Sequence, residues 1–259
     1  MIDSKIRKNF ENEISNLKKI YDENGFVVVK NFLNKKFTQI IKKDLKFFLK
    51  NSKNQKGMNF INKKKKIINT AHNIKEWNYL KKIQNDKCII KVVSNILGCK
   101  LKKFGAEVFA KPAKRGLLSP IHQDNFYWNI KSNIGLTIWI ALDNVNKKNG
   151  SIYYYKRSHK LGLLPHEPSY VPGSSQTVSK SNLKKLKNYK KIFTKLNVGD
   201  AILHSSLVVH GSNNNLSKNN RMGFTLRYIP KNSKFNIRNK IRYEKNLINQ
   251  QKKLINARI

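Results

Sequence analysis

The spacing of apolar residues changes near residue 100, and this change restricts the folds that the chain can adopt. Before it, apolar side chains recur at helical intervals over residues 5–23, 35–50 and 74–97. After it, short β-branched and aromatic runs alternate with turn residues. Many short strands with frequent turns are typical of a sandwich or a barrel. The pattern therefore predicts a mainly β fold with supporting helices in its N-terminal part.

Short sequence signals place the individual elements. Gly25 and Gly98 follow helical patterns and are expected to end them, because glycine readily adopts the left-handed conformation that closes a helix. A polar loop is expected after the second helix, where Lys63–Lys66 is the densest basic run. The expected strands lie at residues 26–29, 103–110, 135–142, 151–155, 201–204, 207–210 and 222–229. Residues 162–180 are rich in Pro, Gly and Ser and too long for a simple turn, which predicts a lid.

The chain has the length of one domain, at 259 residues, and shows no internal repeat and no linker. We therefore predict a single domain over residues 1–259. Its expected parts are a helical support at about 1–99, a β-rich core at about 100–230 and a basic tail at about 231–259. The tail has a weak apolar pattern, which predicts a loosely attached helix.

The net charge of +40 has two interpretations. Strong positive charge is typical of proteins that bind nucleic acids or anionic membranes. Here, however, Lys, Asn and Ile are abundant together, as in proteins encoded by AT-rich codons, and lysines occur all along the chain. We therefore expect no specific nucleic-acid partner, although general attraction to polyanions follows from the charge alone.

Location is predicted from two further features. No apolar run is long enough to span a bilayer, and the polar N-terminal segment lacks the apolar stretch of a signal peptide. Cys88 and Cys99 have no CxxC spacing and no nearby His or third Cys, which predicts reduced thiols and no zinc site. A cytoplasmic protein without a membrane span is expected; the oligomeric state is not predicted.

A candidate metal site begins with the segment His122-Gln123-Asp124. On an extended strand, residues two apart point to the same side, so His122 and Asp124 can offer an imidazole and a carboxylate to one ion. His210, at the end of a second apolar strand, would supply another imidazole. Two histidines and one carboxylate, with positions left open, are typical of non-haem Fe(II) oxygenases. The alternative for so short a motif is a histidine hydrogen-bonded to a nearby carboxylate.

A candidate anion site lies on the strand that Arg221 opens. The residues on one face of that strand are Arg221, Gly223, Thr225 and Arg227. Two arginines and a glycine make a poor apolar surface, but a guanidinium holds a carboxylate through two parallel hydrogen bonds. The alternative is a solvated arginine or a surface ion pair, which applies more strongly to Arg227.

Together these segments resemble the phytanoyl-CoA dioxygenase family of Fe(II)- and 2-oxoglutarate-dependent oxygenases. The resemblance is carried by Phe109–Pro112, Pro120–Asp124, Trp139–Asp143, Asn149–Ser151, Ser158–Gly162, Val198–Asp200, His210–Ser212 and Arg221. They follow the family order over residues 100–230, and their joint pattern is specific although no single piece is. One departure is Lys156-Arg157, where the family more often has Pro-Gly or Lys-Gly; it affects a local turn and not the metal set.

The resemblance implies a fold, a metal and an oxidant. The implied fold is a double-stranded β-helix, also called a jelly roll, of the cupin-like kind. Fe(II) would be bound by His122, Asp124 and His210, and O2 would be the oxidant. A carboxylate at position 124 favours hydroxylation over halogenation, which needs a small apolar residue there.

The resemblance also implies a place for the cosubstrate. Arg221 would pair with the distal carboxylate of 2-oxoglutarate, and Ser212 would hydrogen-bond to it. Trp139 would line the cosubstrate pocket. Thr137 shares the face of Trp139 and is a second candidate, with a β-branched core residue as the alternative.

The primary substrate is only weakly indicated. Glu107 and Lys111 lie on a strand that enters the site, and Phe126 and Trp128 follow the metal motif. With Arg227, they suggest a polar or anionic small molecule held against an aromatic wall. The alternatives are solvent-facing charges and core aromatics. Nothing in the sequence specifies an acyl-CoA.

The expected function is that of a dioxygenase which hydroxylates an unactivated C–H bond of a small molecule and releases succinate and CO2. Two alternatives come from other classes. The charge suggests a nucleic-acid-associated oxygenase, and the fold alone would also suit a non-catalytic jelly-roll binding protein. The presence of the three candidate ligands together with Arg221 argues against the last of these.

Overall fold

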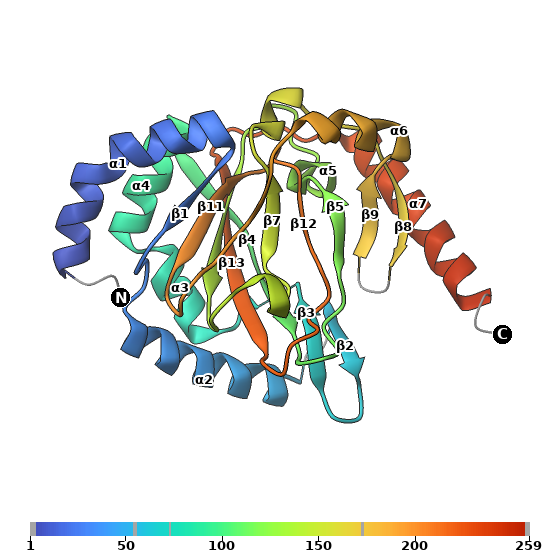
Figure 1. Cartoon of the computed structure of the whole chain (residues 1–259), viewed down its shortest axis with the longest axis horizontal. Helices are drawn as coiled ribbons and strands as arrows, with labels where there is room; N and C mark the ends of the chain where they lie inside the picture. Colours follow the sequence, from blue (N-terminus) through green and yellow to red (C-terminus); the bar gives the residue numbers. More distant parts are fainter. Residues whose placement is uncertain (1–3, 54–55, 73, 172–173, 257–259) are drawn as a thin grey trace.

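The computed structural model describes residues 4–53, 56–72, 74–171 and 174–256, and most of its strands form two facing antiparallel sheets (Figure 1). The larger sheet contains, in order, β1 (Phe26–Val29), β11 (Ala201–Ser205), β6 (Leu136–Ala141), β13 (Arg221–Pro230), β4 (Leu101–Lys111), β3 (Ile67–Ala71) and β2 (Met58–Asn62). The smaller sheet contains β10 (Lys191–Phe193), β7 (Ile152–Tyr155), β12 (His210–Ser212) and β5 (Ser119–His122). The mainly β prediction is confirmed, while the single domain over 1–259 stays a prediction, with residues 1–3 and 257–259 outside the described part.

Alternation along the central strands divides the interior into two layers. On β6, Leu136, Ile138 and Ile140 join the main core on the side of the N-terminal helices. Thr137 and Trp139, between them, face the smaller sheet and line a cavity. Strands β11 and β13 alternate in the same way, because successive side chains of a strand point to opposite faces. One face of the large sheet is therefore apolar core, and the other is free to carry polar groups.

Four helices cover the outer face of the large sheet. They are α1 (Ser4–Asn24), α2 (Lys35–Asn51), α3 (Asn78–Gln84) and α4 (Lys87–Leu97). Their buried residues, such as Ile41, Leu45 and Val93, are fully excluded from solvent and belong to the same core cluster as the sheet. Gly25 has φ 83° and Gly98 has φ 65°, as expected for residues that end helices.

The prediction of one helix over residues 74–97 is wrong, because two helices lie there. Asp86 separates them and caps α4, since its carboxylate accepts from the backbone N–H groups of Cys88 and Ile89. The expected polar loop after α2 is also wrong, since β2 and β3 form a hairpin whose turn is Lys63–Lys66. Strand β12 begins only at His210, so the strand predicted at residues 207–210 is displaced towards the C-terminus.

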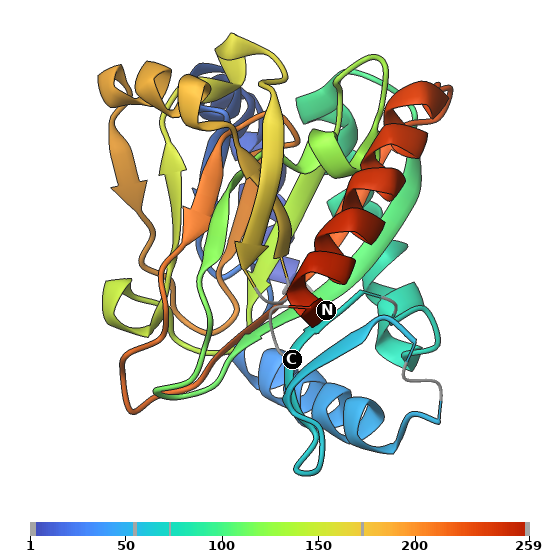
Figure 2. The ribbon, with the colours of Figure 1, turned by 90° about the vertical axis from the view of Figure 1, so that its right-hand side faces the viewer.

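The predicted lid region is a second hairpin, β8 (His166–Val171) with β9 (Ser174–Val178). Helix α7 (Ile237–Asn256) lies beside this hairpin, as Figures 1 and 2 show. The hydroxyls of Tyr243 and Ser175 lie 3.0 Å apart. The remaining short elements are α5 (Asp124–Trp128), α6 (Lys180–Leu183) and 3-10 turns at Lys147–Asn149, Ser158–Leu161 and Lys184–Asn188. Of the described helices, none is both long and apolar enough to cross a membrane.

Candidate active site

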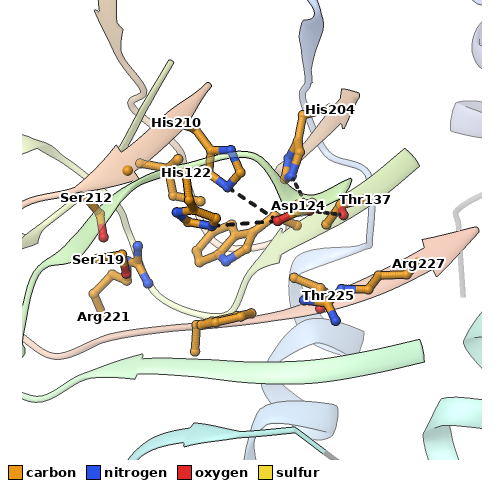
Figure 3. Close-up of a pocket in the computed structure, with 14 residues that line it drawn as sticks. Ser119, His122, Asp124, Thr137, His204, His210, Ser212, Arg221, Thr225 and Arg227 are labelled. Carbon is orange, nitrogen blue, oxygen red and sulfur yellow. Dashed lines mark hydrogen bonds and ion pairs between the residues drawn. The ribbon is translucent and has the colours of Figure 1, made fainter. Parts of the chain in front are cut away.

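The register of the small sheet brings the two candidate histidine ligands together. In the β12–β5 pair, His210 is the direct partner of His122, and their ring centroids are 4.3 Å apart. Directly opposite residues of an antiparallel pair have neighbouring Cβ atoms on the same face. Both rings therefore point into the cavity between the sheets (Figure 3).

Asp124 joins these histidines from a different kind of element than expected. Strand β5 ends at His122, and Asp124 is the first residue of the short helix α5, so the two do not share one strand. Gln123 between them still has an extended backbone, with φ −122° and ψ 132°, which keeps both side chains on the same side. The Gln123 side chain points away, donating to the carbonyls of Gly162 and Leu207.

The donor atoms of the three side chains fit one metal ion. Asp124 Oδ1 lies 3.7 Å from His122 Nε2 and 3.7 Å from His210 Nε2, and ligand atoms of the three residues lie within 4.8 Å of one another. The Nδ1 atoms face the carbonyls of Pro120 at 2.7 Å and Val208 at 3.0 Å. A carbonyl only accepts, so each Nδ1 carries the proton and each Nε2 lone pair is free.

The protonation states of His122, Asp124 and His210 also suit metal binding. Burial lowers the pKa of His122 and of His210, so both imidazoles are neutral at pH 7. Burial alone would raise the pKa of Asp124, but the hydrogen bond from His204, together with the positive charge of Arg227, outweighs it and holds the pKa well below its usual value. Two neutral imidazoles and a carboxylate are the deprotonated forms that bind metal.

Arg221 supplies an uncompensated positive charge at one end of the same cavity. Its side chain is 2% exposed, and its Nε has no hydrogen-bond partner within the described part of the chain. Asp143, a carboxylate that acts on it electrostatically, is itself paired with Lys42. Burial lowers the pKa of the Arg221 guanidinium to about 10. A buried cation without a counter-ion is costly, which favours an anionic ligand here.

Trp139, Ser119 and Ser212 lie around Arg221 in the same cavity. The guanidinium carbon lies 4.8 Å from the centre of the Trp139 ring, which gives it a cation–π contact. Ser119 and Ser212 lie beside it in Figure 3 and line the same cavity. Gly223 leaves room for the tryptophan, because a Cβ there would come within 2.1 Å of Trp139 Cζ2.

Arg227, at the other end of the cavity, is already neutralised. Its two terminal nitrogens donate to the two carboxylate oxygens of Glu107 at 2.7 Å and 2.5 Å. His72 Nδ1 lies 3.1 Å from the same carboxylate. Arg227 lines the cavity, but its charge is balanced by Glu107. An anion is therefore attracted to Arg221 rather than to Arg227.

The other predicted site residues have partners of their own. The Lys111 Nζ donates to the carbonyls of Leu117 and Asn213, which ties the side chain to the backbone. Thr137 lines the cavity, and its hydroxyl donates to Asp124 Oδ2 at 2.7 Å. Trp128 is buried in a small core cluster with Ile130 and Ile229. Phe126 stacks on His166 with ring centroids 4.2 Å apart, at the β8–β9 hairpin.

Sequence reasoning missed the cavity role of His204. His204 lies on β11, 2% exposed, and its Nε2 is 3.2 Å from Asp124 Oδ2. The available signal was strand alternation, because Ile202 and His204 share the face that turns from the main core. Which residue His204 would meet depends on strand register, which the sequence does not show.

Removing the carboxylate of Glu107 should leave the Arg227 guanidinium, which is 15% exposed, without an ion-pair partner. We expect Glu107→Ala to lower the free energy of unfolding by about 3–5 kcal/mol, measured by urea denaturation. Replacing both residues at once, as in Glu107→Leu with Arg227→Met, should recover most of that loss, since no unpaired charge remains. A loss below about 1 kcal/mol for Glu107→Ala, the size of a surface ion pair, would contradict this reading.

Acid should destabilise the metal-free protein. Burial lowers the pKa of His166 to about 3, and its Nε2 accepts from the Gln123 backbone N–H at 3.1 Å, as a neutral ring does. Below the unfolded pKa of about 6.5 the unfolded chain binds the extra proton, so stability is lost as pH falls. From pH 7 to pH 5 we expect a loss of about 1–2 kcal/mol from His166, by urea denaturation. His166→Phe should flatten this slope, and equal slopes would contradict the assignment.

Solved structures with a similar architecture include enzymes described as non-haem and alpha ketoglutarate dependent. EctD from S. alaskensis in its apoform superposes with a TM-score of 0.73 at 16% identity, over 86% of this chain and 79% of that chain. The epimerase SnoN from nogalamycin biosynthesis, in complex with Fe3+, alpha ketoglutarate and nogalamycin RO, gives 0.71 at 16% identity, over 87% and 86%. These likenesses confirm the predicted double-stranded β-helix.

Relatives by sequence place the chain more closely. Peroxisomal phytanoyl-CoA dioxygenase of Bos taurus is 22% identical over 238 residues, which is 86% of this chain and 71% of that protein. The Homo sapiens enzyme of the same name is 21% identical over 225 residues, 82% and 67% of the two chains. The fold, the relatives and the His-Asp-His group define a 2-oxoglutarate-dependent dioxygenase that uses iron. The phytanoyl-CoA dioxygenase (PhyH) family model matches residues 21–223, so the chain belongs to that family.

Proposed function

We propose that this protein is an Fe(II)- and 2-oxoglutarate-dependent hydroxylase of a small molecule, with His122, Asp124 and His210 as the iron ligands. The observation that carries the proposal is that the His-Asp-His group shares a cavity with Arg221, a buried guanidinium that has no ion-pair partner among the described residues. Either feature alone could have an ordinary structural role. Together, in one cavity, they match a ligand with a chelating end and a distal carboxylate.

Each side chain has a definite task in this proposal. Arg221 and Ser212 hold the distal carboxylate of 2-oxoglutarate, and the Trp139 ring packs against the Arg221 guanidinium. The keto acid end then reaches the His-Asp-His group. Iron held there would supply the oxygen activation that converts 2-oxoglutarate to succinate and CO2 and hydroxylates a C–H bond. The chain contributes ligand geometry, orientation and exclusion of water.

The polar side chains at the substrate end of the cavity are already paired. Thr137, Thr225, His204 and Arg227 line it, and Glu107 balances Arg227. Thr137 and His204 bond to Asp124, and Thr225 bonds to the Glu107 backbone. These groups therefore require no hydrogen bonds from a substrate, and we propose a small-molecule substrate without assigning to this chain the acyl-CoA in the names of the mammalian relatives.

The proposed location is the cytoplasm, supported by Cys88 and Cys99, which are both free thiols, one of them buried. Reduced thiols are typical of that compartment. The mammalian relatives are named peroxisomal, so fractionation of the native cells decides between the two. No nucleic-acid partner is proposed, because the cavity and not the charged surface carries the chemistry.

Succinate formation without added substrate tests the proposed function. With Fe(II), 2-oxoglutarate and O2, the protein should produce succinate slowly, and omitting any one of the three should stop it. Asp124→Asn keeps the shape of the side chain and removes the negative ligand, so it should reduce the rate to background. Succinate formation that persists in Asp124→Asn, or its absence from folded wild-type protein, would overturn the proposal.

A further inference from the structure

The two carboxylate oxygens of Asp124 face different partners. Oδ2 accepts hydrogen bonds from Thr137 Oγ1 at 2.7 Å and from His204 Nε2 at 3.2 Å. Oδ1 faces the Nε2 atoms of His122 and His210, both at 3.7 Å. Figure 3 shows this division, with His204 and Thr137 on one side of the carboxylate and the two ligand histidines on the other.

Strand register places both donors to Oδ2 side by side. In the β11–β6 pair, His204 is the direct partner of Thr137, and both are at most 2% exposed. Both belong to the face of the large sheet that lines the cavity. Helix α5 delivers Asp124 to this pair from the other side of the cavity. Hydrogen bonds from two neighbouring strands of the large sheet thus fix the orientation of the Asp124 carboxylate.

A third residue, Tyr154, indicates which ring nitrogen of His204 carries the hydrogen. The Tyr154 hydroxyl lies 3.0 Å from His204 Nδ1, and the Tyr154 ring is fully buried between Phe26 and His210. An ionised carboxylate only accepts, so His204 Nε2 must carry a proton toward Asp124. Nδ1 is then an acceptor, and the Tyr154 hydroxyl donates to it. The chain of donors runs from Tyr154 through His204 to Asp124.

We propose that His204, Thr137 and Tyr154 are positioning residues that restrict Asp124 to one metal-binding oxygen, Oδ1. This inference rests on the proposed metal role of the His-Asp-His group. With Oδ2 saturated by two protein donors, the carboxylate binds the metal through one oxygen. A carboxylate that bound through both oxygens would occupy one more position on the metal, and that position instead stays open for 2-oxoglutarate or oxygen. Through Thr137 and His204, the large sheet therefore limits how many oxygen atoms Asp124 gives to the metal.

Anaerobic titration with Co(II), a coloured substitute for Fe(II), tests the inference without turnover. His204→Phe keeps an aromatic ring and removes the donor, and it should weaken Co(II) binding about 10- to 100-fold. It should also change the intensity of the visible Co(II) absorption, which depends on coordination number. His204→Gln returns an N–H donor and should recover most of the loss. Thr194→Val, which removes a buried hydroxyl that donates to Ile152, is the matched control and should match wild type.

Two further variants keep the test decisive if His204→Phe does not fold. Thr137→Val and Tyr154→Phe are nearly isosteric and remove one hydroxyl each, and both should weaken Co(II) binding and alter its absorption. Unchanged affinity and unchanged absorption in these folded variants, or in folded His204→Phe, would overturn the inference while leaving the proposed function intact. Wild-type protein that binds no Co(II) would overturn the proposed function and this inference with it.

Discussion

Replacing His210 with alanine is expected to weaken Fe(II) binding by about 100-fold and to reduce iron-dependent succinate formation to background. Complete four-ligand zinc sites gain about 10–16 kcal/mol from their metal, so one ligand accounts for roughly 3 kcal/mol. His210 is buried opposite His122, and no other described histidine takes its place, because His204 Nε2 is already turned to Asp124. Isothermal titration under anaerobic conditions measures the loss.

A second histidine serves as the control for this prediction. His159 lies outside the cavity, with its Nε2 3.0 Å from the Asp22 carbonyl. His159→Ala also removes one imidazole, yet it should leave Fe(II) affinity unchanged. If the two variants bound Fe(II) equally well, or if His210→Ala bound it as tightly as wild type, the metal would have to sit elsewhere.

Replacing Arg221 with alanine is expected to weaken 2-oxoglutarate binding by about 1.5–3 kcal/mol, which is roughly 10- to 150-fold. The guanidinium is the cation at that end of the cavity without an ion-pair partner among the residues described. Arg221→Lys keeps the charge but loses the planar fork, so its affinity should fall between wild type and Arg221→Ala. Binding is measured by isothermal titration with the metal-loaded, oxygen-free protein.

Arg221→Ala and Arg227→Ala, two substitutions on β13, are expected to have different effects on the free energy of unfolding. Arg221→Ala removes a buried charge that has no counter-ion, so the free protein should be as stable as wild type or more stable. Arg227→Ala instead leaves the partly buried Glu107 carboxylate with the His72 ring as its remaining partner, and it should cost about 3–5 kcal/mol. Unchanged 2-oxoglutarate affinity in Arg221→Ala, or the reverse order of the two stabilities, would remove Arg221 from its proposed role.

Local patterns predict the parts of this fold that depend on neighbouring residues. Helices α1 and α2 and strands β1, β6 and β13 lie close to where apolar spacing and glycine signals place them. The hairpin β2–β3 was missed because its strands are rich in Asn and flank a run of four lysines, which resembles a polar loop. The division of α3 from α4 was missed because apolar residues continue at helical spacing on both sides of Asp86. A single polar residue within that pattern does not show that a new helix begins after it.

The candidate site divides in the same way. Short sequence motifs predict His122, Asp124, His210 and Arg221 as site residues, and the fold brings all four to one cavity. Partners set by strand register could not be predicted. The contacts of Arg227 with Glu107 and of Thr137 with Asp124 join residues on different elements, and their alignment is decided by tertiary packing. For the same reason Lys111 reads as a site residue in the sequence and is tied to backbone carbonyls in the fold.

Anaerobic titration of the purified protein with Fe(II) and then 2-oxoglutarate tests the central claim most directly. If the His-Asp-His group and Arg221 act together, 2-oxoglutarate should produce a weak visible charge-transfer band that saturates at one equivalent. The band should be absent from His210→Ala and should need much higher 2-oxoglutarate in Arg221→Ala. A folded wild-type protein that shows no band, or a band that survives in His210→Ala, would contradict the assignment of iron and cosubstrate to this cavity.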